Sequence, residues 1–322
     1  MLQNNIQYST VKKGFCSGCG ICSNACPNKA ISIVYDKTKQ YKPIVNEIKC
    51  INCGLCVKYC PNSAAEKDRC VEILQKSKDR ISVGIENANG FYRCKVRNND
   101  DLIRSASGGF VAEFSKKLLS EGIIDCVVHG ERVIAKTGSE HYRACISRSL
   151  NEIDSRRSSI YGPVCFDNVI EEFRDKKEKI LVVGVPCVIR GIKRLFRNDN
   201  SFNKNTLYTI ALVCSHNVTG QFVDFFAEYY GIDKQTKYSA NLRGKNINME
   251  SRHAFTLNYN NENGESIICE DRSAFNGAWR NYLFAMPACN YCNDLWGWEA
   301  DISTKDCWEA EGNKDRYGSS LV

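Results

Sequence analysis

The sequence lacks both a long apolar run and an apolar leader. Its most apolar stretch, residues 180–189, is well short of the ~18 residues that a membrane-spanning helix needs. The first ten residues are polar, so the hydrophobic core of a secretory signal peptide is absent. These absences argue against a membrane span and predict a soluble protein, and the thiols described next predict a cytoplasmic one. Its 322 residues are enough for about two domains.

Cysteine, in contrast, is abundant, with 19 residues in the chain. So many thiols, odd in number and without a signal peptide, fit a reducing compartment. Eight of them form two runs with the spacing C-x2-C-x2-C-x3-C, each followed by proline. The runs are Cys16, Cys19, Cys22 and Cys26, then Cys50, Cys53, Cys56 and Cys60. This spacing is typical of bacterial ferredoxins with two 4Fe-4S clusters, so it predicts electron transfer at low oxygen.

The fourth cysteine of each such run binds the cluster of the other run. The expected ligand sets are therefore Cys16, Cys19, Cys22 and Cys60 for one cluster, and Cys50, Cys53, Cys56 and Cys26 for the other. Zinc binding and disulfides are the alternatives. Two zinc sites need only paired C-x2-C hooks, so the doubled four-cysteine run ending in proline favours the clusters.

Acidic residues are scarce in the same segment. Residues 1–62 contain eight lysines and only Asp36 and Glu47, a formal charge of +6, while the whole chain carries +7. Such a surface favours an acidic electron-carrier protein as partner, because complementary charge speeds encounter. The lysines are explained equally well as an offset to the negative charge of the clusters. Nucleic acid is disfavoured, because no arginine cluster or aromatic interleaving accompanies the lysines.

The apolar pattern divides the chain into three parts. Residues 1–62 are expected to form an α+β ferredoxin-like two-cluster module, and residues 63–100 a connecting helix and a hairpin around the sequence NANG. Strands and helices alternate from residue 101 to 322, with the clearest buried strand at 179–185. This alternation predicts an α/β domain with parallel strand pairs.

Four cysteines of the second domain are candidates for a further metal site. Cys187 opens a predicted helix, and Cys214 ends the next predicted strand. Parallel strands end at one edge of a sheet, so these two are expected to meet there. Cys289 and Cys292 add a C-x2-C hook. The set fits a third 4Fe-4S cluster, while a zinc hook and buried structural cysteines remain alternatives.

The segment SASGGF at 105–110 precedes a predicted helix. Free N–H groups and glycines at a helix start form an anion site suited to a phosphate, although a serine-capped helix start explains the segment as well. His216, beside Cys214, could donate to a cofactor or a cluster sulfur, or serve as a structural histidine.

These segments, in this order, resemble the family of beta subunits of coenzyme F-420 hydrogenases and dehydrogenases. The sequences that carry the resemblance are SGGF at 107–110, SIYGP at 159–163, GVPCVIRGIK at 184–193, LVCSH at 212–216, PACNYC at 287–292, ADIS at 300–303 and GSSLV at 318–322. Ile160 stands where related sequences often carry lysine. Related sequences continue further, so the 101–322 domain is expected to be truncated or shortened at its C-terminus.

The resemblance implies an FAD-binding α/β domain with the third cluster beside the flavin. Its expected FAD contacts are Ser107, Gly108, Gly109 and Tyr161. The implied function is an iron–sulfur flavoprotein oxidoreductase, exchanging electrons between the clusters and FAD to reduce or oxidise a small substrate or a deazaflavin coenzyme. No residue is singled out as a catalytic acid or base. The alternatives are an electron-transfer subunit of a larger redox complex with no substrate of its own, and a non-redox protein that keeps the fold.

Overall fold

The computed structural model describes residues 4–63, 88–157, 159–246, 248, 255–308, 315 and 317–322. The helix expected after residue 62, and the first strand of the expected hairpin, lie outside these residues. Among the helices that are described, none is both long and apolar enough to cross a membrane.

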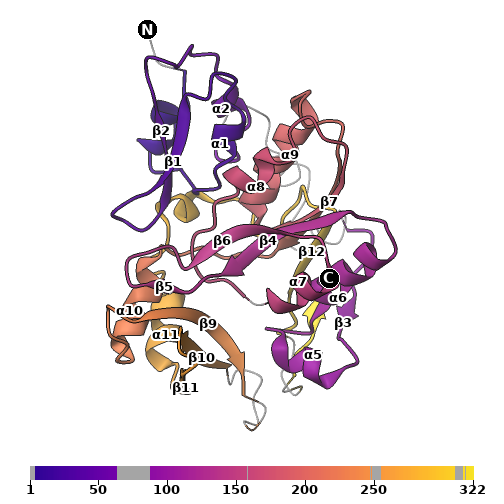
Figure 1. Ribbon diagram of the computed structural model, residues 1–322, viewed down its shortest axis with the longest axis vertical. Coiled ribbons are helices and arrows are strands. Elements are labelled where there is room, and N and C mark those ends of the chain that lie inside the picture. The colour runs from indigo at the N-terminus through magenta and orange to yellow at the C-terminus, as the bar shows by residue number, and fades with distance from the viewer. Residues whose placement is uncertain are drawn as a thin grey trace, which may run out of the picture.

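The N-terminal module is built from short elements (Figure 1). They are the π-helix η1 (Gln7–Val11), α1 (Ile21–Asn24), β1 (Ile31–Tyr35), β2 (Tyr41–Val45) and α2 (Leu55–Lys58). Strands β1 and β2 form an antiparallel pair. Gly20 and Gly54 precede the two α-helices with φ of 84° and 78°, a conformation that glycine adopts without strain. The cysteine runs therefore curl tightly, as their spacing requires.

A seven-stranded sheet forms the centre of the second part of the chain, in the order β3-β13-β12-β8-β7-β4-β6. The strands are β3 (Arg93–Cys94), β4 (Cys126–Arg132), β6 (Tyr142–Ser147), β7 (Lys179–Gly184), β8 (Thr206–Leu212), β12 (Ile302–Asp306) and β13 (Ser320–Leu321). The central pairs β12–β8, β8–β7 and β7–β4 are parallel, which confirms the parallel pairing expected from the sequence. Strand β3 pairs with β13, from the far end of the sequence.

Helices cover both faces of this sheet (Figure 1). On one face, α6 (Phe110–Ser120) and α7 (Leu150–Ser155) pack on side chains such as Leu181 of β7. On the other, α8 (Asp167–Glu171) and α9 (Pro186–Asn198) pack on Ile180 and Val182. This second core continues into the N-terminal module through Ile21. Alternate residues of β7 thus face opposite helical layers, as expected for a strand buried on both sides.

A second, antiparallel sheet lies beside the first, in the order β11-β10-β9-β5. It consists of β5 (Ala135–Lys136), β9 (Lys237–Lys245), β10 (Phe255–Asn261) and β11 (Ser266–Cys269). Helices α10 (Gln221–Tyr229) and α11 (Ser273–Arg280) pack on it through an aromatic core that includes Phe222 and Phe275. The described part of residues 101–322 therefore combines two sheets rather than one α/β sheet.

Helix α9 joins the N-terminal module to the central sheet. A Cβ atom on Gly191 would lie 3.2 Å from Cγ1 of Ile21 and 3.3 Å from Cδ of Pro61, so glycine allows the helix to approach closely. Arg190 donates to the carbonyl of Pro61 at 3.2 Å, and Arg194 to that of Cys60 at 2.6 Å. Both arginines are buried, so the module is held by specific, water-excluded hydrogen bonds.

Candidate metal and cofactor site

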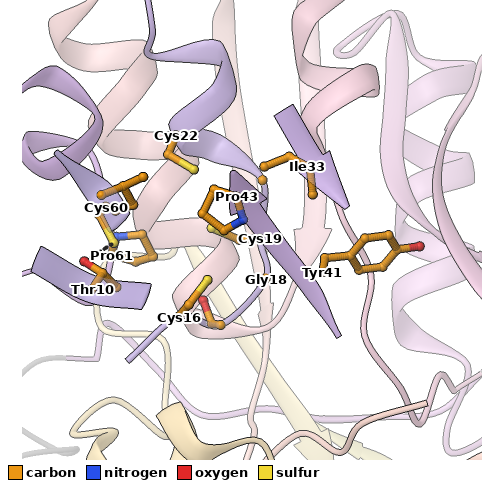
Figure 2. A pocket seen from close by; sticks show the side chains of 13 residues that line it. Thr10, Cys16, Gly18, Cys19, Cys22, Ile33, Tyr41, Pro43, Cys60 and Pro61 are labelled. Carbon is orange, nitrogen blue, oxygen red and sulfur yellow. Dashed lines mark hydrogen bonds between the residues drawn. The ribbon is translucent and has the colours of Figure 1, made fainter. Parts of the chain in front are cut away.

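The first predicted ligand set lines a single cavity of the N-terminal module. Figure 2 shows Cys16, Cys19, Cys22 and Cys60 around it, from two distant stretches of the sequence. The Thr10 hydroxyl lies 3.7 Å from Sγ of Cys60. Burial raises the pKa of Cys16 to about 11, and the pKa values of Cys19 and Cys22 well above their usual range. Thiolates buried in this way need a cation to stabilise them, and iron supplies that charge.

The second predicted set, Cys26, Cys50, Cys53 and Cys56, lines a second cavity of the module. The N–H of Ala30 donates to Sγ of Cys26 at 3.2 Å, and burial raises the pKa of Cys56 to about 11. Cys53 is exposed, so this set lies nearer to solvent than the first. The structure thus brings together both sets that were assigned from the sequence, including the exchanged fourth ligands.

Cys187, Cys214, Cys289 and Cys292 also come together. Cys187 lies in the first turn of α9, Cys214 follows β8, and the other two belong to the 3-10 helix η2 (Pro287–Tyr291) and its end. The negative charge of Cys187, Cys289 and Cys292 adds to burial in raising the pKa of Cys214. The parallel strands β7 and β8 deliver the first two cysteines to one sheet edge, and η2 brings the hook to them.

Backbone amides surround the sulfurs of this third set. The N–H of Asn217 donates to Sγ of Cys289 at 3.3 Å, and the N–H of His216 donates to the Cys214 sulfur. Burial raises the pKa of Cys187 to about 12. Amide donors and exclusion of water are the features by which proteins set the potential of an iron–sulfur cluster.

The spacing of the sulfur atoms can be compared with the spacing around a single zinc ion. Four thiolates about 2.3 Å from one zinc lie roughly 4 Å apart. In the described residues, no three cysteine sulfurs lie within 4.8 Å of one another. The tetrads as described are therefore wider than a single tetrahedral zinc ion requires.

The three tetrads are neighbours. Cys22 of the first set is close enough to Cys56 of the second for their charges to interact. On the other side, Cys19 interacts in the same way with Cys187, and the Ser17 hydroxyl hydrogen-bonds to the Cys187 sulfur. The first tetrad therefore lies between the solvent-facing second tetrad and the third.

The turn expected to contact FAD is packed against the chain itself. Ser107 Oγ donates to the Ser319 carbonyl at 2.8 Å. A Cβ on Gly108 would lie 2.4 Å from the carbonyl oxygen of Cys94, and Gly109 has a φ of 79°. Packing against β3 and the chain at β13 thus accounts for a serine at 107 and a glycine at 108 without a bound ligand.

Tyr161 lies at the end of a row of rings that begins beside the third tetrad. The ring centroid of His216 lies 4.0 Å from that of Trp279, in a tilted contact, and 4.3 Å from that of Tyr282, in a stacked one. Trp279 in turn meets Tyr161 edge-on at 5.0 Å. Burial lowers the pKa of His216 and favours a neutral imidazole. The resemblance-based candidate Tyr161 is therefore linked to the cysteine site by direct contacts.

A group of basic side chains around Tyr161 was missed by the sequence reasoning. Arg243 hydrogen-bonds to Tyr161 and pairs with Asp306. Lys245 donates to the carbonyls of Leu102 and Ser107 at 2.6 and 2.7 Å. The two-residue spacing of Arg243 and Lys245 indicates that they share one face of a strand. It does not indicate which residues pack against that face.

Comparison with known protein families identifies the chain. The model of the coenzyme F420 hydrogenase/dehydrogenase beta subunit matches in both its parts, the N-terminal part at residues 91–171 and the C-terminal part at 177–322. The chain belongs to this family. A 4Fe-4S dicluster domain model matches residues 15–94, so this member of the family is an iron–sulfur protein with a mixed α and β fold.

Two relatives of this family member are distant in sequence. It is 22% identical over 204 residues to a subunit of the F420H2 dehydrogenase of Methanosarcina mazei, a match that covers 63% of this chain. The chain spans about half the length of that curated relative (54%). A solved structure, a xenon derivative of the F420-reducing NiFe hydrogenase complex from Methanosarcina barkeri, matches with a TM-score of 0.47 and 16% identity, over 72% of this chain and 74% of the other.

Proposed function

We propose that this protein exchanges electrons between three 4Fe-4S clusters and an FAD, for the two-electron reduction or oxidation of a small substrate. The observation that carries the proposal is the third tetrad: Cys187, Cys214, Cys289 and Cys292 converge from separate segments and adjoin the first tetrad through Ser17. A structural role for four cysteines would not require them to meet each other beside the first tetrad.

Each part of the chain has a distinct task in this proposal. The exposed Cys53 makes the second tetrad the side from which a partner reaches the clusters. The amides of His216 and Asn217 adjust the potential of the third by donating to its sulfurs. A bound flavin supplies the conversion between one-electron and two-electron transfer. Tyr161, at the far end of the ring contacts, is the residue best placed to meet it.

The placement of FAD at Ser107, Gly108, Gly109 and Tyr161 rests on the family resemblance. The contact between Lys245 and the Ser107 carbonyl supports it, because it places a positive charge beside the turn. The substrate we propose is a deazaflavin coenzyme or another small acceptor, in line with the names of the relatives. The partner we propose is an acidic electron carrier that meets the lysine-rich module, or a larger redox complex.

A second function is favoured by a separate observation. Ser107 and Gly108 pack against β3 and the chain at β13, so the sequence of this turn can be explained by packing alone, without a flavin. The chain would then be an electron-transfer subunit with three clusters, and the substrate site would lie on a partner protein.

The deciding experiment is the iron and acid-released flavin content of anaerobically purified protein. About twelve irons with one FAD per chain support the flavoprotein proposal. About twelve irons without flavin favour the electron-transfer subunit. About eight irons contradict the third cluster, and with it both forms of the proposal.

A further inference from the structure

Arg272 is a buried cation that forms no ion pair with an acidic residue among those the structure describes. Its residue surface is only 9% exposed, and its Nε has no hydrogen-bond partner. The guanidinium carbon lies 5.4 Å from the ring centre of Phe255 and 4.6 Å from that of Phe275. No carboxylate in the described part of the chain forms an ion pair with it. A buried charge in this state is costly unless something compensates for it.

Its neighbours increase the excess of positive charge. Arg243 lies over the same Phe255 ring at 4.3 Å, and its side chain is 12% exposed. Lys245, two residues further along β9, donates to carbonyl oxygens rather than to a carboxylate. Asp306 pairs with Arg243. Asp315 also interacts with Lys245, but it pairs with Lys95. Among the described side chains of this group, neither carboxylate is therefore paired with Arg272.

We propose that Arg272, together with Arg243 and Lys245, forms a binding subsite for an oxyanion, the phosphate or carboxylate group of a bound ligand. The guanidinium offers a planar set of donors that matches both groups, and the aromatic rings hold it in a low-dielectric place where an ion pair is strong. The oxyanion supplies the negative charge that the protein does not.

The position of the subsite connects it to the redox centre, and this step rests on the proposed function. Tyr161 interacts electrostatically with both Arg243 and Arg272, and its ring contacts Trp279 on the other side. A ligand anchored on Arg272 would therefore have Tyr161 between its anion and the third tetrad. The oxyanion has two sources: the phosphates of the flavin, or an acidic group of the substrate.

The test uses the full chain, reconstituted anaerobically, with Arg272→Gln as the variant. Arg280→Gln is the matched control, since Arg280 is the exposed last residue of α11, the helix whose N-cap is Arg272. Binding of FAD and of riboflavin, which has no phosphate, is measured by flavin fluorescence. Inorganic pyrophosphate and succinate are tested by the shift that they cause in the thermal midpoint. Iron content and tryptophan fluorescence report whether each variant is folded.

We expect Arg272→Gln to weaken an oxyanion ligand about tenfold or more, the loss expected when a charged donor is removed. Weaker FAD binding with unchanged riboflavin binding assigns the subsite to the flavin phosphates. Unchanged FAD binding with a lost pyrophosphate or succinate shift assigns it to an acidic substrate.

The proposal is overturned if FAD, pyrophosphate and succinate bind to Arg272→Gln as they do to Arg280→Gln. If Arg272→Gln does not fold, Arg272→Lys replaces it, because lysine keeps the charge and loses the planar fork. Unaltered oxyanion binding in that variant and in Lys245→Gln would also overturn the proposal. Failure of the proposed function is read separately, from an iron content of about eight, and leaves the pyrophosphate result intact.

Discussion

The two tetrads of the N-terminal module and the tetrad of the second domain are assembled in different ways. In the module, each set takes three ligands from one seven-residue stretch and the fourth from the other run. In the second domain, the four cysteines proposed as ligands come from the end of β8, from η2 and its end, and from the start of α9. The cysteines of the module are set close together by their spacing in the sequence. Those of the third tetrad meet only after the central sheet has formed.

This difference predicts different sensitivities. The module has two short strands and two four-residue helices in its described residues, so its clusters must supply much of its stability. The third tetrad sits on a packed core that includes Val182 and Ile189, which are essentially inaccessible to solvent. Loss of the third cluster should therefore leave its domain folded.

The largest expected effect follows from Cys187→Ser. We expect this variant to lose about four of twelve irons, because serine is a poor ligand for iron, and to keep the two clusters of the module. Iron analysis combined with electron paramagnetic resonance of the reduced protein measures the loss.

Cys269→Ser is the matched control, since Cys269 is a half-buried cysteine of β11 that belongs to none of the three tetrads. It should keep the full iron content. An unchanged iron content in Cys187→Ser would show that the third tetrad does not bind a cluster. The comparison between the two regions would then no longer hold.

A smaller effect is expected from Gly108→Ala. The added Cβ would lie 2.4 Å from the Cys94 carbonyl oxygen and 2.5 Å from the Ser320 nitrogen, so backbone segments must move apart. We expect a destabilisation of about 1–3 kcal/mol, typical of an overpacked site. Tryptophan fluorescence in urea measures it selectively, because Trp279, Trp296, Trp298 and Trp308 all lie in the second domain.

The comparison is with Gly277→Ala in α11, where an added Cβ meets nothing within 4 Å. That change should be neutral or should stabilise the helix by up to about 1 kcal/mol. Equal urea midpoints for the two variants would show that β3 and β13 do not hold the turn as tightly as the contacts indicate.

The smallest effect concerns Lys245 and pH. Burial, followed by the charge of Arg243, lowers the pKa of Lys245 from 10.5 to about 8. Between these pH values the unfolded chain holds a proton that the native protein has released. The free energy of unfolding should therefore rise with pH in that window, by less than about 1.4 kcal/mol per pH unit because Lys245 is only half-buried.

Lys245→Gln should flatten this rise, whereas Lys58→Gln, which removes an exposed lysine of the module, should not. Urea midpoints at pH 7.5, 8.5 and 9.5 make the comparison. Parallel pH profiles for wild type and Lys245→Gln would show that the native lysine titrates at its ordinary pKa.

The sequence predicted the two regions of the molecule to different extents. The ligand sets of the module follow from spacing and from the exchange of the fourth cysteine, so no fold was needed to assign them. Cys187 and Cys214 could be paired because strong apolar runs marked β7 and β8 as neighbouring parallel strands. The basic group could not be predicted, because Arg272 meets Arg243 only after β9, β10 and α11 have packed around Phe255. Strand β13 has two residues, too few for any periodicity to reveal it.

Helix α9 has a consequence for the speed of electron exchange. Cys187 stands in its first turn, and two turns later, after a rise of about 10 Å, Arg194 holds the carbonyl of Cys60. In the proposed function, one helix would therefore carry a ligand of the third cluster and hold the backbone of a ligand of the first. The rate of electron tunnelling decreases steeply with the distance between donor and acceptor. A hinge between the two cluster sites would therefore make this rate vary with thermal motion. By fixing this separation within a single helix, the fold would keep the rate of the proposed transfer constant.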